Sequence, residues 1–334
     1  MTPSLAWGII GAGRIARKFI AAQPAGAVRA IASRELPRAA GMAHELGVAH
    51  AHGSYDALLA DAAVQAVYIA LPNALHAEWS IAAARAGKHV LCEKPFAPTL
   101  AEAEAMFAAA REHGVWMMEA FMYRFHPQTV ALQRLLDERA IGRVRTIAIN
   151  FGIYLDRPED ARWSAELAGG CAMDLGCYCV SLARMAAGEA PSSVTALAQY
   201  AASGVDETIG AVLEYPSGIV AHIGCSYRTS YNQAVTIAGD DGAIAIARPF
   251  TLPPDSETTL TLMRGRHFAP EETLRYGPAN VFRLEADGLA ALVTSGHGAH
   301  GLPEMPLAET LENTATLEAI LLSARERRTV ALAV

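Results

Sequence analysis

The chain has 334 residues, of which 52% are hydrophobic and 18% charged, and its formal net charge is −7. This length favours two domains, and the composition excludes a disordered chain because enough apolar surface is present to form a large core. The acidic charge argues against nucleic acid or an anionic membrane as the main partner, and no apolar run is long enough to span a bilayer.

The N-terminal sequence MTPSLAWGIIGAG lacks the basic and apolar regions of a signal peptide. Five cysteines are present, an odd number, and none forms a C-x-x-C pair. We therefore expect reduced, buried thiols, no metal site and a cytoplasmic location.

The first third alternates short apolar runs with helical patterns. Strands are predicted at 5–10, 27–33, 66–71, 88–92 and 115–120, with helices at 14–22, 37–47, 74–87 and 99–114. Strand–helix alternation at this spacing predicts a parallel, doubly wound sheet, and strands that are apolar throughout are typical of burial on both faces.

The pattern changes after about residue 125. A helix is predicted at 126–139, a long strand at 144–155, a helix near 171–187 and a closing amphipathic helix at 306–328; between 194 and about 276 the chain reads as antiparallel strands separated by turns. We expect an α/β protein: a dinucleotide-binding Rossmann domain at 1–123 and an α+β domain at 124–334 for substrate binding and oligomerisation.

The segment GIIGAGRIA places Gly11, Gly13 and Ala16 in a G-x-G-x-x-A pattern between a predicted strand and a predicted helix. The first glycine permits a tight turn, the second lets a pyrophosphate approach the backbone, and the small third residue allows close packing. The amides that open the helix, at Arg14 and Ile15, then face the phosphates. This context favours dinucleotide binding.

The second strand ends in Ser33, where NAD sites usually carry an acid. Ser33 can hydrogen-bond a 2′-phosphate, and the guanidiniums of Arg34 and Arg38 can pair with it. This pattern favours NADP(H) over NAD(H), although the nearby Glu35 could reach a ribose. The alternative is that both arginines simply face solvent.

Two further strand ends should meet at the cofactor crevice. The segment ALPNALHAEW brings Leu71, Pro72 and Asn73 to the end of one strand, with His76 at the start of the next helix. Asn73 can hydrogen-bond the cofactor, whereas His76 either contacts it or only opens the helix.

The segment KHVLCEKPFA places Glu93 and Lys94 at the end of a neighbouring strand. Pro95 holds Lys94 in an extended conformation. Lys94 is therefore a candidate catalytic residue, and the alternative is a turn with a solvated lysine. Glu93 either contacts the cofactor or only holds the turn.

In the second domain, GGCAMDLGCY places Asp174 and Tyr178 four residues apart on one helix face. An acid and a phenol together can form a proton-transfer pair, and a nearby lysine would lower the tyrosine pKa. The alternative is a helix cap and a packed ring. Aromatic and hydrogen-bonding side chains elsewhere suit either a polyol or an interface: Arg124, Tyr154, Arg162 and Trp163. GHGAHG at 296–301 reads as a loop rather than a metal site.

Four motifs together resemble the Gfo/Idh/MocA oxidoreductase family: G-A-G-R-I-A at 11–16, C-E-K-P at 92–95, M-E-A-F-M-Y-R-F-H-P at 118–127 and G-G-x-x-x-D-L-G-C-Y at 169–178. The resemblance covers nearly the whole chain and is greatest to the branch of dimeric dihydrodiol dehydrogenases, NADP-dependent D-xylose dehydrogenases, glucose–fructose oxidoreductase and 1,5-anhydrofructose reductase. It implies a Rossmann domain followed by a domain with an open, largely antiparallel sheet that often mediates dimerisation.

The resemblance also implies roles. Lys94 matches the E-K-P lysine of the family's active site, Asp174 and Tyr178 match its D-x-G-x-Y segment, and Ser33 and Arg38 match positions that hold the 2′-phosphate. We expect NADP(H)-dependent hydride transfer at a carbinol or carbonyl carbon of a sugar or cyclic polyol, by a homodimer or higher oligomer. Tyr178 or Lys94 would transfer the proton. The alternatives are a glycosidase that oxidises and re-reduces the sugar with bound NAD, and a nucleotide sensor without turnover.

Overall fold

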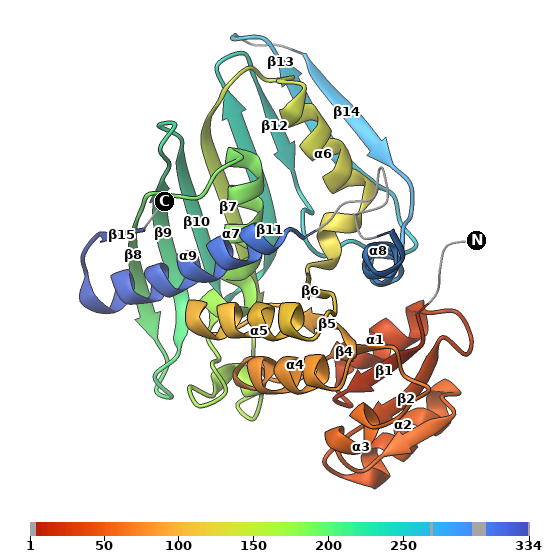
Figure 1. Ribbon diagram of the computed structural model, residues 1–334. Coiled ribbons are helices and arrows are strands. Elements are labelled where there is room, and N and C mark those ends of the chain that lie inside the picture. The colour runs from red at the N-terminus through yellow and green to blue at the C-terminus, as the bar shows by residue number, and fades with distance from the viewer. Residues whose placement is uncertain (1–4, 268–269, 296–304, 333–334) are drawn as a thin grey trace. The chain divides into compact units, whose positions relative to one another are not determined.

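Figure 1 shows a computed structural model of the chain, which describes residues 5–267, 270–295 and 305–332. The chain divides into two compact units. Unit 1 comprises the described residues of Met1–Ala97, Ala101–Phe125 and Asn280–Leu307, and unit 2 comprises those of Pro98–Leu100, His126–Ala279 and Ala308–Val334. Within the described ranges, no helix is both long and apolar enough to cross a bilayer.

Unit 1 is a series of strands joined by helices and 3₁₀ turns. In chain order these are β1 (Trp7–Ile10), α1 (Arg14–Ala22), β2 (Val28–Ala32), α2 (Leu36–Leu46), β3 (His50–His52), α3 (Tyr55–Leu59), β4 (Ala66–Ile69), η1 (Asn73–Leu75), α4 (His76–Arg85), β5 (His89–Glu93), α5 (Leu100–Glu112), β6 (Met117–Ala120), η2 (Met122–Phe125) and α8 (Val281–Ser295).

These strands form a parallel sheet, which among the described residues has six strands in the order β3-β2-β1-β4-β5-β6. Every residue of β1, β4 and β6 is buried, as the apolar sequence runs predict for a sheet covered on both faces. The strand order reverses between β1 and β4, so the carboxyl ends of these strands mark the place where doubly wound folds bind ligands.

Unit 2 contains α6 (Pro127–Asp137), β7 (Val144–Tyr154), η3 (Ala161–Trp163), a π-helical turn η4 (Ala172–Gly176), α7 (Cys177–Ala187), β8 (Ser193–Tyr200), β9 (Asp206–Glu214), β10 (Val220–Ser226), β11 (Arg228–Gly239), β12 (Gly242–Ile246), β13 (Thr258–Arg264), β14 (Glu271–Tyr276), α9 (Leu307–Glu326) and β15 (Val330–Ala331). Leu307 itself falls in unit 1.

The sheet of unit 2 has nine described strands in the order β14-β13-β12-β11-β7-β10-β9-β8-β15. It is largely antiparallel, as predicted, and its parallel pair is β7 with β10. Helices α6, α7 and α9 lie over one face (Figure 1). Buried and exposed residues alternate along β9 and along the second half of β11, so the opposite face is exposed.

Four strands and α-helices lie outside the predicted elements: β3, α3, α8 and β15. Among them α8 matters most, because it contacts α1, η2, β5 and β6 and therefore belongs to unit 1. A single boundary at 123/124 does not describe this packing, since the chain returns to unit 1 after residue 279.

Candidate active site

The glycine-rich turn joins β1 to α1 in unit 1. Gly11 has φ of +106°, and a Cβ there would lie 2.4 Å from the carbonyl oxygen of Ala70, so no other residue fits without a backbone shift. A Cβ on Gly13 would meet nothing within 4 Å, which leaves open space beside the first turn of α1. Arg14 is exposed and Ile15 half-buried at this helix start, whereas Ala16 is fully buried. The turn thus has the shape that a pyrophosphate needs.

The end of β2 carries the residues predicted to select the cofactor. Ser33 is buried, and its Oγ accepts a hydrogen bond from the amide of Glu35 at 3.4 Å. Arg38 donates from Nε and Nη2 to the carbonyl oxygen of Ala12, at 3.3 and 3.2 Å. The guanidinium is therefore held against the glycine-rich turn.

Arg34 is exposed, and its positive charge acts on Tyr55 together with that of Arg38. Burial raises the pKa of Tyr55, and the two guanidiniums oppose that rise. Two cations consequently face one small region at the end of β2.

The end of β4 leads through Leu71, Pro72 and Asn73 into α4. These three residues are half-buried, whereas His76 is fully buried. Burial lowers the pKa of His76. Its ring nitrogens lie 2.9 Å from the backbone carbonyl oxygens of Pro95 and Leu71.

The end of β5 carries Glu93 and Lys94. Glu93 is buried; the hydroxyl of Tyr68 donates to its Oε1, and the amide of Lys94 donates to its Oε2 at 3.2 Å. Lys94 is half-buried, and its peptide bond to Pro95 is cis. The Glu93 side chain thus ties this turn to β4.

Asp174 and Tyr178 lie in unit 2, where the π-helical turn η4 runs into α7. Both residues are buried. The Tyr178 ring packs edge-on against Phe151, with 5.6 Å between centroids, and at a tilt against Phe250. A π-type turn widens the helix locally, and such turns are frequent at functional sites.

Arg162 holds Asp174 in unit 2. Its Nε donates to Oδ2 of Asp174 at 2.6 Å, and its Nη1 donates to Oδ1 of Asp160 at 3.2 Å. The carboxylate of Asp174 raises the pKa of Arg162, although burial opposes this. The guanidinium is therefore a permanent cation between two acids.

The aromatic side chains of Trp163 and Tyr227 lie near this ion pair. Trp163 packs edge-on against Tyr227, and the guanidinium of Arg228 lies 4.7 Å from the centre of the Trp163 ring. The Tyr227 hydroxyl donates to the carbonyl of Gly170 at 2.9 Å. Burial raises the pKa of Tyr227, so its phenol stays protonated. Sequence reasoning missed Asp160, Tyr227 and Arg228.

The two remaining candidate substrate residues, Tyr154 and Arg124, differ in exposure, and Tyr154 is the cross-strand partner of Arg228. Tyr154 ends β7 and is 65% exposed. Arg124 lies in η2 of unit 1 and is 3% exposed, so its charge is enclosed by protein.

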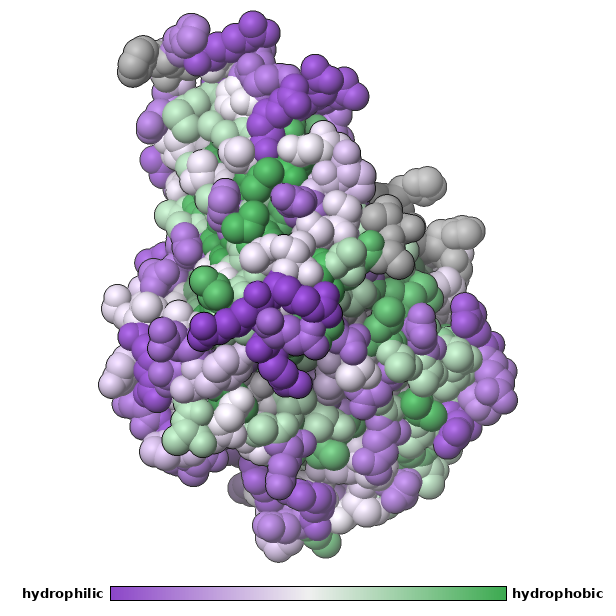
Figure 2. All heavy atoms as spheres, turned by 90° about the vertical axis from the view of Figure 1, so that its left-hand side faces the viewer, coloured by the Kyte–Doolittle hydropathy of each residue, from purple (hydrophilic) through white to green (hydrophobic). Residues whose placement is uncertain are grey.

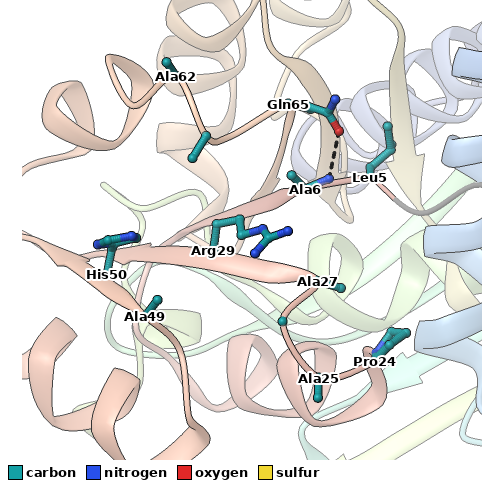
Figure 3. Close-up of a pocket in the computed structure, with 12 residues that line it drawn as sticks. Leu5, Ala6, Pro24, Ala25, Ala27, Arg29, Ala49, His50, Ala62 and Gln65 are labelled. Carbon is teal, nitrogen blue, oxygen red and sulfur yellow. Dashed lines mark hydrogen bonds between the residues drawn. The ribbon is translucent and has the colours of Figure 1, made fainter.

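A pocket of about 660 Å³ lies at the end of the unit 1 sheet where the strands begin, opposite the carboxyl ends described above (Figure 3). It is lined by the amino ends of strands, including Arg29 and His50, and by Gln65, whose Oε1 accepts from the amide of Ala6 at 3.0 Å. Because open α/β sheets bind ligands at the carboxyl ends of their strands, this pocket is not the expected cofactor site.

Within the described ranges, no group of three or more His, Cys, Asp or Glu side chains is arranged to hold a metal ion. The histidine-containing segment 296–301 lies outside those ranges.

Comparison with known proteins gives matches over both units. The model of the oxidoreductase family with an NAD-binding Rossmann fold, GFO_IDH_MocA, matches residues 5–121, and the GFO/IDH/MocA C-terminal domain matches residues 129–245.

Named relatives cover most of the chain. D-xylose 1-dehydrogenase (NADP(+)) 2 of Haloferax volcanii is 38% identical over 304 residues, which is 91% of both chains. Trans-1,2-dihydrobenzene-1,2-diol dehydrogenase of Sus scrofa is 32% identical, over 82% of this chain and 83% of its own.

A solved structure agrees in fold. The 3-ketoreductase KijD10 from Actinomadura kijaniata, in complex with NADP and TDP-benzene, superposes with a TM-score of 0.86 at 31% identity, over 95% of this chain and 97% of its own. The family, the fold and the dehydrogenase class predicted from the sequence are confirmed. This chain belongs to the Gfo/Idh/MocA family of oxidoreductases.

Proposed function

We propose that this protein transfers a hydride reversibly between NADP(H) and a carbinol or carbonyl carbon of a sugar or related cyclic polyol. The observation that carries the proposal is that a chain similar over 91% of its length to an NADP-dependent D-xylose dehydrogenase also has Lys94, Asp174 and Tyr178 at the matching motif positions. A protein that only sensed nucleotides would not need an amine, a carboxylate and a phenol of this kind.

The residues of unit 1 fit a dinucleotide. We assign the pyrophosphate to the open side of Gly13 and the first turn of α1, with Gly11, Arg14 and Ile15 in the same turn. Ser33, Arg34 and Arg38 would hold a 2′-phosphate, and the place of Arg38 against Ala12 supports this. The remaining contacts are assigned to the ends of β4 and β5, namely Leu71, Pro72, Asn73 and Glu93. We accordingly prefer NADP(H) to NAD(H).

When bound, the nicotinamide supplies or takes up the hydride. We assign Tyr178 as general base, which removes the hydroxyl proton during oxidation and returns it during reduction. Lys94 would orient the substrate hydroxyl. Lys94 is the competing candidate for the proton donor.

Unit 2 supplies polar and aromatic groups for the substrate. Asp174 would orient the hydroxyl that reacts, and Arg162 keeps its carboxylate in place. Trp163, Tyr154 and Arg124 are further candidates for contact with the polyol. Aromatic faces and paired charges suit a ring with many hydroxyl groups.

The test is a panel of aldoses, cyclitols, dicarbonyls and dihydrodiols with NADP⁺, NADPH, NAD⁺ and NADH, followed by the absorbance of the reduced nicotinamide. We expect net NADPH formation with at least one aldose or dihydrodiol. Consumption of a glycoside without net NADPH would instead show a glycosidase with transient redox. Binding of NADP(H) without turnover of any substrate would show a sensor.

We also propose a homodimer formed through the exposed face of the unit 2 sheet, in the cytoplasm. On β8 and β9, Leu197 and Val212 project from the same face, because Val212 pairs with Thr195, two residues from Leu197. They are 67% and 37% exposed. Figure 2 shows another face of the molecule, where hydrophobic residues lie in small groups among hydrophilic ones. All five cysteines are free thiols, which suits a reducing compartment.

Sedimentation equilibrium tests the dimer. Leu197→Glu places a charge on the exposed face and should shift a dimer toward monomer. Glu78→Gln, at an exposed position of α4 in unit 1, is the control and should leave the mass unchanged. A monomeric wild-type protein would overturn this part of the proposal without affecting the proposed reaction.

A further inference from the structure

His76 is fully enclosed and contacts two separate turns of unit 1. Its Nδ1 lies 2.9 Å from the carbonyl oxygen of Pro95, and its Nε2 lies 2.9 Å from the carbonyl oxygen of Leu71. Because both ring nitrogens face the backbone, the ring has no nitrogen left for a ligand. A direct contact with a cofactor therefore explains the geometry less well than a link between turns.

Both turns follow the carboxyl ends of their strands, at the same end of the sheet. Strands β4 and β5 are parallel neighbours, with Ile69 paired to Cys92, so Leu71 and Pro95 follow strand ends that lie side by side. The next residues along these turns are the ones assigned to chemistry. Asn73 lies two residues after Leu71, and Lys94 immediately precedes Pro95.

Helix α4 holds the ring between them. His76 is its first residue, and the buried side of the helix continues through Ala77, Ser80, Ala83 and Ala84. The backbone of His76 therefore cannot move without displacing a packed helix. A ring fixed at its base fixes both carbonyls that it reaches.

The protonation state of the ring adds a constraint. Burial lowers the pKa of His76, and the positive charge of Lys94 acts in the same direction, while the carbonyls of Pro95 and Leu71 oppose them. A neutral imidazole has one N–H and so donates to one carbonyl at a time. The two turns thus share a single donated proton through the two tautomers.

We propose that His76 is a positioning residue that holds the Lys94 turn through the Pro95 carbonyl and the Asn73 turn through the Leu71 carbonyl. This inference rests on the proposed function, in which the Lys94 turn serves proton transfer and the Asn73 turn serves cofactor binding. It also gives a reason for the imidazole ring at this position, because its two nitrogens point in different directions from one rigid plane.

Two amide variants separate the two contacts. In His76→Asn, the side-chain amide can replace the donor at Nδ1 and keep the Pro95 contact, while the Leu71 contact is lost. In His76→Gln, the longer side chain can replace the donor at Nε2 and keep the Leu71 contact, while the Pro95 contact is lost. The measurements are kcat with the best sugar and the Kd for NADPH from fluorescence titration.

We expect His76→Asn to raise the Kd for NADPH by about fivefold or more, with kcat within about twofold of wild type. His76→Gln should lower kcat by about fivefold or more and leave the Kd within about twofold. Ser80→Ala is the matched control, because Ser80 is equally buried one turn further along α4. It should change neither quantity.

Equal shifts of the same quantity in both variants would show a merely structural histidine and would overturn the proposal, as would wild-type values in both. Urea midpoints identify a variant that is simply unfolded. In that case the test is NMR of the wild-type protein. A His76 ring N–H that is held as proposed should be protected from solvent exchange in ¹⁵N-resolved spectra, and rapid exchange would refute the link. If the wild-type chain turns over no substrate, the proposed function fails, whereas the NADPH Kd still tests the Leu71 contact.

Discussion

The guanidinium of Arg162 bridges Asp174 and Asp160, with its Nε 2.6 Å from Oδ2 of Asp174 and its Nη1 3.2 Å from Oδ1 of Asp160. The Asp174 side chain is 12% exposed and that of Arg162 is 39% exposed. The acid of the D-x-G-x-Y segment is therefore oriented from within its own unit, by a residue in the 155–170 loop.

Replacing Arg162 should disturb Asp174. In Arg162→Ala the carboxylate loses this cation, and we expect the free energy of unfolding to fall by about 1–3 kcal/mol, less than for a fully buried pair because solvent screens Arg162. We expect kcat/KM to fall by roughly tenfold or more. Arg162→Lys should lie between, since one ammonium cannot reproduce the planar fork. Urea unfolding and steady-state kinetics measure both effects.

Arg157→Ala is the matched control for that loop, because Arg157 is exposed a few residues earlier. It should leave both quantities unchanged. If Arg162→Ala retained wild-type kcat/KM, the ion pair would have no part in the reaction.

Arg38 allows a test of cofactor choice. Because its guanidinium lies against Ala12, Arg38→Ala should raise the Kd for NADPH by about tenfold or more and change the Kd for NADH far less. The ratio of the two constants is the measurement, since loss of the Ala12 contact can weaken both. Arg29→Ala, at the other end of the same sheet (Figure 3), should leave the ratio unchanged. An equal rise of the Kd for NADPH and the Kd for NADH would mean that Arg38 only supports the turn.

Removal of the Tyr178 hydroxyl tests the proton transfer. A positioned general base contributes about 10² to 10⁴ in rate, so Tyr178→Phe should lower kcat by that factor while NADPH still binds. The ring stays packed against Phe151 and Phe250, so stability should change little. Tyr215→Phe is the control, because it also removes a buried hydroxyl, and that hydroxyl has no hydrogen-bond partner in the described structure. Near-normal turnover in Tyr178→Phe would transfer the role to Lys94.

The sequence predicted those parts of the fold that depend on local rules. Gly11 was recognisable because a tight turn after a strand requires a residue with positive φ, and the structure has +106° there. The apolar strands β1 and β4 were recognisable because both of their faces are buried, so every position is apolar. Short elements were missed: β3 has only three residues, and α3 has five, although Ser54 accepts from the amide of Ala57 as an N-cap.

Helix α8 was missed because Gly288 interrupts its pattern. A Cβ there would lie 2.4 Å from the Phe125 ring, so the glycine serves close packing that only the tertiary structure reveals. The Arg162–Asp174 pair was missed for the same kind of reason. Each residue was a candidate by itself, but their pairing depends on the path of the 155–170 loop. The contacts of His76 likewise join residues from two turns, and no local pattern encodes them.

Glu285 offers a stability test. It is fully buried on α8, and neither carboxyl oxygen has a hydrogen-bond partner within the described ranges. Burial raises its pKa well above the ordinary 4.5, and the negative charge of Glu93 raises it further. The folded chain therefore keeps a proton that the unfolded chain releases as the pH rises above 4.5. Stability from this group is present at low pH and is lost as the pH rises toward the folded-state pKa.

Glu285→Gln removes that titration while keeping the shape of the side chain. Relative to wild type, its free energy of unfolding should increase with pH by up to about 1.4 kcal/mol per pH unit above the unfolded-state pKa, until the folded-state pKa is reached. Urea unfolding between pH 5 and pH 8 would follow this. The slope is the test rather than the offset, because the amide adds a buried donor with a constant cost. Glu285→Leu should share the slope at a different offset, and a difference that stays flat or falls with pH would contradict a protonated Glu285.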